Sequence, residues 1–400
     1  MDVPRRGLRV GAAVLVVSFS GTGCAPGDEA LSNEVDTREQ GLDWGQSLLA
    51  PLDRETLRQV IIELPDATAA QVRVQGSAGR WLGSAGVADL HTGAPMPGDA
   101  RFRIGGLTQT FTATVLLQLA AERRVDLDRP VQHSLPGLLP PNYPLITVRQ
   151  LLNHTHGLPG VPLATRQPEW FFEHRFRRWS PRELVALALP QGPRFTPGTV
   201  QEYGHIGYLV AGLLIEKVTG RPYGHAVRER ILTPLGLRDT SVPGNDPTIP
   251  GPHARGYEAL ASADGTQRWV DVTEANQSLT WAAGEMISST ADLDTFLSAL
   301  FRGRLLPSEQ LEEMFTVPDV PSAHGGRAAH GAGLARYELD GVTVWGRRGA
   351  RQGYVSGMGA TRDSSRRLVY AFNTHRMGQA RPVLADRIIA TTFAARAARP

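Results

Sequence analysis

The chain has 400 residues, of which 41% are hydrophobic, so it suits one large domain or two small ones with a sizeable core. The formal net charge is only +3, and basic and acidic residues are well mixed along the chain. No stretch of basic residues with aromatic residues between them is present in the sequence. This balance gives no case for a nucleic-acid partner. Cys24 is the single cysteine, which excludes an internal disulfide, so the fold must rest on packing.

Residues 1–24 are typical of an export signal. Three arginines precede a short apolar run at 10–19, which is too short to span a bilayer as a stable anchor. Small residues then lead to Cys24 in a pattern that resembles a lipobox, although Gly21 stands where a leucine is usual. We expect an exported, extracellular protein that a lipid anchor at Cys24 tethers to the membrane. Plain secretion is the alternative.

Residues 25–50 are polar and lack periodicity, which predicts a flexible tether. Residues 51–400 then form the predicted domain. Its first elements are a helix at 53–64 and two strands at 70–75 and 80–88 around a glycine-rich hairpin.

The middle of the domain, from about 131 to 310, is predicted to be mostly helical, and β-prone runs return after about 325. Helices are expected at 148–153, 181–189, 205–219 and 291–301, strands at 333–337, 341–345, 355–361 and 368–373, and a last helix at 381–396. Strands at both ends with helices between them predict an α+β fold. Its antiparallel sheet is formed by both chain ends and flanked by helices, with an inserted, mostly helical lobe.

The segment 102–118 is the one around which the other elements are arranged. It contains a short apolar strand end, Gly105-Gly106 and an amphipathic helix with a wide buried face, because apolar residues recur at three- and four-residue spacing. The two glycines are also found in phosphate-binding loops, but the fuller glycine pattern and the P-loop lysine are missing.

This segment, FRIGGLTQTF, resembles the first motif of the secreted serine D-alanyl-D-alanine carboxypeptidases of actinomycetes and of the related class C β-lactamases. Further landmarks follow in order and cover about residues 55–395: LLNHTHGLPG, FTPGTVQEY, GLLIEKVTG, ILTPLGLRDT, HGAGLARYE and VWGRRGARQGY. The resemblance implies the fold of that family, and no cofactor or metal is expected.

In that family the first motif carries a serine nucleophile and, one turn later, a lysine that deprotonates it. The matching positions here are Gly106 and Gln109, which offer neither group. Thr108 and Thr110 do not substitute, because on a helix neither lies where the serine hydroxyl would be. DD-carboxypeptidase and β-lactamase activity are therefore expected to be absent.

The second motif of the family, Tyr-x-Asn, matches Tyr203-Gly204-His205. One hypothesis makes Tyr203 and His205 a proton-transfer pair, because an imidazole titrates near neutral pH. The alternative is that the His205 ring merely caps the helix that follows. His154 and His156 could be a metal pair, but His154 matches a structural landmark of the family.

The third motif, His-Thr-Gly or Lys-Thr-Gly, matches Arg347-Arg348-Gly349. Side chains alternate along a strand, so at most one of the two arginines is expected to face the site. Arg347 takes the first position of the motif, as a catalytic-motif residue with a donor fork suited to carboxylates. The alternative interpretation is that Arg347 is a solvated arginine on a sheet edge, without a role in the site. The resemblance also implies substrate-binding roles for Arg336 and Trp281.

Three functions remain open from the sequence. The preferred one is a non-catalytic relative whose cleft binds a peptide or small molecule with a carboxylate, such as a D-Ala-D-Ala-type peptide. The second is an enzyme of changed chemistry that uses Tyr203, His205 and Arg347, for instance in a biosynthetic pathway. The third is an interaction protein whose cleft is unused.

Overall fold

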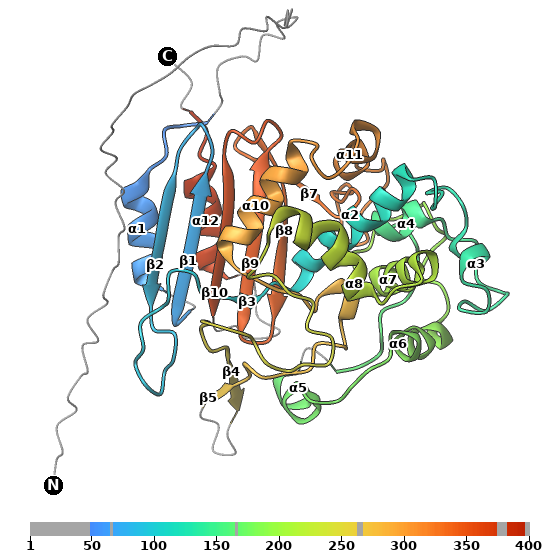
Figure 1. Cartoon of the computed structure of the whole chain (residues 1–400), viewed down its shortest axis with the longest axis horizontal. Helices are drawn as coiled ribbons and strands as arrows, with labels where there is room; N and C mark the ends of the chain where they lie inside the picture. Colours follow the sequence, from blue (N-terminus) through green and yellow to red (C-terminus); the bar gives the residue numbers. More distant parts are fainter. Residues whose placement is uncertain (1–48, 65–66, 165–166, 262–266, 374–381, 397–400) are drawn as a thin grey trace, which may run out of the picture.

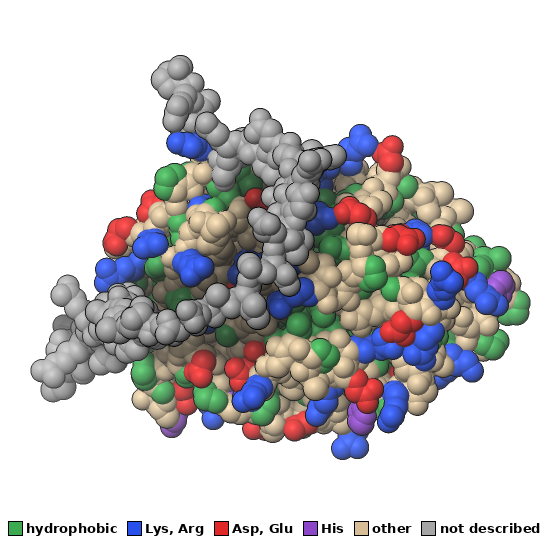
Figure 2. Space-filling model, turned by 45° about the horizontal axis from the view of Figure 1, so that its top comes forward, with side chains coloured by type: hydrophobic (Ala, Val, Ile, Leu, Met, Phe, Trp, Pro, Cys, Tyr) green, Lys and Arg blue, Asp and Glu red, His purple; other side chains and the backbone are tan. Residues whose placement is uncertain are grey.

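The computed structural model describes residues 49–64, 67–164, 167–261, 267–373 and 382–396 (Figure 1). The predicted export signal with Cys24, and nearly all of the predicted tether, lie outside the described residues. Within these ranges no helix is both long and apolar enough to cross a membrane. On the face shown in Figure 2, basic and acidic side chains are interspersed.

A six-stranded antiparallel sheet joins the two ends of the described chain, which confirms the predicted α+β architecture. Its strands, in the spatial order β2-β1-β10-β9-β8-β7, are β1 Ala69–Gln75, β2 Trp81–Gly86, β7 Ala335–Leu339, β8 Val342–Arg351, β9 Tyr354–Thr361 and β10 Arg367–Asn373. Strand β1 pairs directly with β10, so the first and last strands of the described chain lie side by side as the second and third strands of the sheet.

Helices cover both faces of the sheet (Figure 1). On one face, α1 (Arg54–Glu63) and α12 (Val383–Thr392) share a hydrophobic core with the sheet. On the other face, α10 (Thr290–Phe301) packs against the sheet and belongs to the larger core of the helical lobe. Asp53 caps α1, since its carboxylate accepts a hydrogen bond of 2.9 Å from the Thr56 amide.

The helical lobe is inserted between β2 and β7 and contains the helices predicted at 148–153, 181–189 and 205–219. It comprises α3 Val131–Ser134, α4 Val148–Leu152, α5 Pro168–His174, α6 Pro181–Ala188, η2 Leu189–Gln191, α7 Ile206–Thr219, α8 Tyr223–Val227, η3 Arg228–Leu232, α9 Thr233–Leu235, η4 Trp281–Ala283 and α11 Ser308–Phe315. The sequence sets several ends: Ser180 and Glu183 form a capping box at α6, and Gly220 ends α7 with a φ of 68°.

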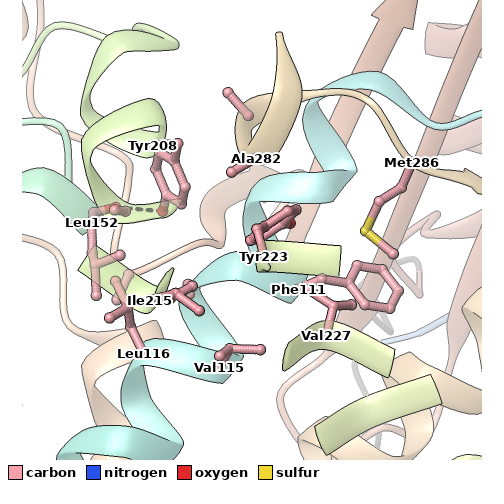
Figure 3. Close-up of a cluster of buried hydrophobic side chains, with 14 of the residues drawn as sticks. Phe111, Val115, Leu116, Leu152, Tyr208, Ile215, Tyr223, Val227, Ala282 and Met286 are labelled. Atoms are coloured by element: carbon pink, nitrogen blue, oxygen red, sulfur yellow. Dashed lines mark hydrogen bonds between the residues drawn. The ribbon is translucent and has the colours of Figure 1, made fainter. Parts of the chain in front are cut away.

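The central segment forms β3 (Phe102–Arg103), η1 (Gly105–Leu107) and α2 (Thr108–Ala121). Side chains of α2 pack among those of α7 and α8 (Figure 3). The prediction of an amphipathic helix understates the burial, because 11 of the 14 residues of α2 are buried. Its threonines are satisfied inside, as when the Thr110 hydroxyl donates to the Gly333 carbonyl at 2.7 Å. Helix α2 is thus enclosed on all sides.

Part of the segment 131–310 is not helical. Strands β4 (Tyr257–Ala261) and β5 (Gln267–Asp271) form a separate hairpin, and β6 (Ile287–Ser288) pairs with β3. The sequence YEALA contains good helix formers, so local preference pointed away from a strand. Pairing with β5 overrides that preference.

Candidate active site

The first motif places Gly106 in η1 and Gln109 in the first turn of α2, and the third motif lies on β8, which runs directly against η1. The close approach needs Gly349, because a Cβ there would overlap the Ile104 carbonyl oxygen. Arg347 lies two residues earlier in β8 and therefore points to the same face of the sheet. This register brings the Arg347 guanidinium to Gln109.

Arg347 is buried, with 3% of its surface exposed, and its guanidinium is surrounded by uncharged acceptors. One terminal nitrogen donates to Gln109 Oε1 and to His154 Nε2, the latter at 3.1 Å. The other donates to His330 Nδ1 at 2.9 Å. Arg348 points to the other face and pairs with Asp386 at 3.0 Å, so the prediction that only one arginine faces the site is confirmed.

Tyr203 closes the outer side of this network, and the residue is 41% exposed. Gln109 Nε2 donates to the Tyr203 hydroxyl at 3.2 Å. The Arg347 guanidinium lies 4.8 Å from the centre of the Tyr203 ring, a cation–π distance. The amide of Gln109 thus holds the phenol with its nitrogen and the guanidinium with its oxygen.

The space beside Gly106 is where a serine side chain would begin. A Cβ on Gly106 would lie 3.1 Å from the Tyr203 hydroxyl and 3.0 Å from the Arg348 carbonyl oxygen. The only lysine in the sequence, Lys217, lies in the last turn of α7. Thr108 and Thr110 are buried and engaged with Met286 N and Gly333 O, respectively.

The charge of Arg347 has no carboxylate partner within ion-pair distance among the described residues. Burial, together with the positive charge of Arg347, lowers the pKa of His330 to about 3. Burial is also the main cause that holds the pKa of His154 well below its usual value, and Arg347 is the next. Both rings are therefore neutral at physiological pH. The site contains a buried cation with only neutral acceptors, an arrangement that favours an incoming anion.

The other predicted site residues have different surroundings. His205 is exposed at the start of α7, with its ring centre 5.9 Å from that of Tyr203, and its side chain does not cap the helix as the alternative hypothesis held. Arg336 has a 52% exposed side chain that pairs with Glu338 at 2.6 Å. Trp281 packs against Tyr223, with ring centres 5.2 Å apart.

Sequence reasoning missed the roles of two histidines. In the sequence His154 matches a structural landmark and His330 begins the landmark HGAGLARYE, and no local signal links either ring to Arg347. The rings of His154 and His156 are 6.5 Å apart, and His156 Nδ1 accepts a hydrogen bond from Leu158 N at 2.9 Å. Within the part of the chain that the structure describes, no group of three or more His, Cys, Asp or Glu side chains is arranged to hold a metal.

Comparison with known proteins places the chain in a family. The family model described as Beta-lactamase matches residues 57–393, so the chain belongs to the Beta-lactamase family. The resemblance inferred from the motifs is confirmed at that level.

Among solved structures, a D-stereospecific amidohydrolase from Streptomyces is 40% identical with a TM-score of 0.75, covering 86% of this chain and 99% of that one. The D-amino acid amidase of Ochrobactrum anthropi, in complex with L-phenylalanine amide, is 30% identical with a TM-score of 0.73, covering 84% and 97%. A D-aminopeptidase of Cereibacter sphaeroides is 27% identical over 72% of this chain and 53% of its own. The chain spans about half the length, or less, of the first curated relatives it matches.

Proposed function

We propose that this protein is a member of the Beta-lactamase family that does not form an acyl-enzyme and whose cleft binds a compound with a free carboxylate. The observation that carries the proposal is the pair Gly106 and Gln109, in which the Gln109 amide joins Tyr203 to Arg347. Removal of a serine nucleophile costs about 10⁶-fold in turnover in a serine hydrolase. The names of the relatives are those of enzymes and do not support inactivity, so the proposal rests on these two positions.

The ligand class follows from charge and from the relatives. Arg347 is a buried cation whose partners are neutral, and a hydrogen bond to a charged group contributes about 1.5–3 kcal/mol. Two of the structural relatives are named a D-stereospecific amidohydrolase and a D-amino acid amidase, which supports a ligand of D configuration. An acyl-D-Ala-D-Ala peptide combines the two features.

Calorimetry tests the binding. N-acetyl-D-Ala-D-Ala should bind the protein, and Arg347→Ala should weaken binding about tenfold or more, which corresponds to 1.4 kcal/mol. Amidation of the C-terminus should weaken binding similarly, and the two changes together should add little, because both remove one interaction. Arg348→Ala is the matched control, since Arg348 points to the other face and pairs with Asp386. Equal binding of acid and amide would contradict the carboxylate pocket.

A fluorescent penicillin tests the absence of covalent chemistry. We expect no labelling of the purified protein, even at long incubation, because Gly106 has no nucleophilic atom. A penicillin adduct that mass spectrometry maps to residues 104–110 would show that the acyl-enzyme route survives.

A specific observation favours one alternative, an enzyme of changed chemistry. The Tyr203 hydroxyl lies beside the position of the missing serine side chain, with the ring of His205 edge-on to the phenol. Turnover of D-amino acid amides that is lost in Tyr203→Phe would support this alternative and replace the first proposal. If the protein shows neither binding nor turnover, the hypothesis of an interaction protein with an unused cleft remains.

We further propose that the protein is exported and tethered to the membrane through Cys24, as the pattern of residues 1–24 indicates. The mature protein should then partition into detergent and lose that behaviour in Cys24→Ser. A mature N-terminus other than Cys24 would exclude the anchor.

A further inference from the structure

We propose that His330 is a ligand-binding residue of this cleft: when a carboxylate enters, its ring releases Arg347, binds a proton and pairs with the ligand. This inference rests on the proposed function, because it needs an anion at Arg347. If His330 has this role, the site includes one more ligand-binding residue, and binding of the ligand is coupled to the uptake of a proton.

A carboxylate that reaches the terminal nitrogens of Arg347 competes with the present partners Gln109, His154 and His330, which take three of the five guanidinium N–H groups. Gln109 and His154 are fully buried, with 0% of their surfaces exposed, whereas His330 is only partly buried. The ring of His154 is also enclosed by aromatic neighbours, with centres at 4.9 Å for Tyr203 and 5.3 Å for Tyr208. His330 is therefore the partner on the solvent side of the guanidinium.

Two hydrogen bonds with Gln201 hold the main chain at His330, whereas its side chain is only partly buried. Gln201 Oε1 accepts a hydrogen bond of 3.0 Å from His330 N, and Gln201 Nε2 donates one of 2.8 Å to His330 O. The ring stacks on Tyr203, which is itself exposed, with centres 5.6 Å apart. Rotation about the side-chain bonds thus frees one nitrogen of Arg347 without a change in the loop.

The proton follows from the charges that face His330. These are Arg347 from β8, His154 from the loop after α4, and Tyr203 from the loop before α7, while α2 contributes the neutral Gln109. In the free protein the imidazole cannot be protonated while its Nδ1 accepts from Arg347. A bound carboxylate offsets the guanidinium charge and accepts from the freed ring, so a solvent proton adds to His330 and an imidazolium–carboxylate pair forms.

Calorimetry of N-acetyl-D-Ala-D-Ala in two buffers of different ionisation enthalpy measures the proton. The blocked amine and the carboxylate of this peptide do not titrate between pH 6 and 8. We expect net uptake of up to one proton per peptide and an affinity that falls by up to tenfold per pH unit as the pH rises. In His330→Gln, uptake and pH dependence should both vanish. His324→Gln, at an exposed site in the same loop, should behave as the wild type.

The outcomes separate this inference from the proposed function. Binding without proton uptake overturns the role of His330 and leaves the carboxylate pocket intact, whereas no binding overturns both. Uptake that persists in His330→Gln assigns the proton to another group and overturns the inference. If His330→Gln does not fold, the NMR signals of the His330 ring in the wild type decide: the ring should be neutral in the free protein and protonated in the complex at pH 6.

Discussion

Gln109 and Arg347 are matched to each other at the level of single residues. The amide oxygen of Gln109 accepts from the buried guanidinium, and no carboxylate of the described chain is within ion-pair distance to offset that charge. A lysine at position 109, as in the resembling family, would place a second cation beside Arg347. Gln109 in place of the family's lysine and Arg347 in place of its histidine or lysine are therefore coupled changes. Either one alone would leave the site with a poorly matched pair of side chains.

This dependence predicts strong coupling between the two positions. Gln109→Lys should lower the free energy of unfolding by about 3 kcal/mol or more, because it buries an uncompensated charge. Gln109→Lys combined with Arg347→His should recover most of that loss, since a neutral imidazole can accept a hydrogen bond from the lysine. Urea denaturation of the four proteins measures the coupling. Additive losses would show that residues 109 and 347 act independently.

Glu285 is a buried carboxyl group that the proposed function does not use. It is fully buried, and burial outweighs the opposing effect of the Gly244 main chain on its pKa. Burial raises the pKa of Glu285 to about 8, so the folded protein holds this proton at neutral pH.

The contribution of Glu285 to the stability of the protein should therefore fall as the pH rises from about 4.5 to about 8. In this range the folded state binds more protons than the unfolded state, because the folded pKa exceeds the unfolded one. The side chain in Glu285→Gln stays neutral, so this decline should be flatter in the variant. The difference in free energy of unfolding between the variant and the wild type should therefore grow in favour of the variant as the pH rises. Thermal or urea denaturation at pH 5 and pH 8 measures the difference. The exposed Glu274→Gln is the control, and an unchanged pH slope in Glu285→Gln would contradict the assignment.

At the level of elements, the site is created by the docking of β8 on η1. The Ser356 hydroxyl donates to the Ile104 carbonyl at 3.1 Å, and Gly349 leaves the room that this contact needs. Neither strand nor helix contains the site alone. Its geometry depends on a contact between residues more than 240 positions apart.

Gly349→Ala should separate these two elements. The new methyl group would overlap the Ile104 carbonyl oxygen and lie 2.8 Å from the Ser356 hydroxyl oxygen. Overpacking of this kind costs about 1–3 kcal/mol in stability, and here it should also weaken peptide binding by moving Arg347. Gly160→Ala is the control, because no atom lies within 4 Å of the added Cβ. Denaturation together with calorimetry checks both effects, and unchanged binding would show that Arg347 tolerates the shift.

The sequence predicted those elements whose signals are local. Periodicity and caps located α1, α6, α7 and α10 to within two residues. Strand alternation predicted that at most one of the two arginines faces the site, and the motif match selected Arg347. What it missed depends on long-range packing. The β4–β5 hairpin contradicts a helical preference, and His330 reaches Arg347 only through tertiary contacts from a loop.

At the scale of the whole molecule, the two chain ends meet in one sheet that two separate cores stabilise. One core lies between the sheet and the pair α1 and α12, and the other fills the helical lobe and the opposite face. The Arg366 guanidinium, which is 1% exposed, ties the first core together by donating to the Thr392 carbonyl at 2.9 Å and to the Ala50 carbonyl at 2.9 Å. Both chain ends therefore contribute to the stability of the sheet that holds Arg347.

A substitution in α12 should accordingly destabilise the whole domain. Ile388 is fully buried in the core beneath the sheet, and Ile388→Ala should lower the free energy of unfolding by about 2–5 kcal/mol, since the methyl groups leave a cavity. Ile389→Ala on the same helix is the control and should cost less, because Ile389 is only partly buried. Since β1 pairs with β10, we expect one cooperative transition at a lower urea midpoint, with fluorescence and circular dichroism changing together. Separate transitions by the two probes would show that the core beneath the sheet unfolds independently of the helical lobe, and that the site does not depend on α12.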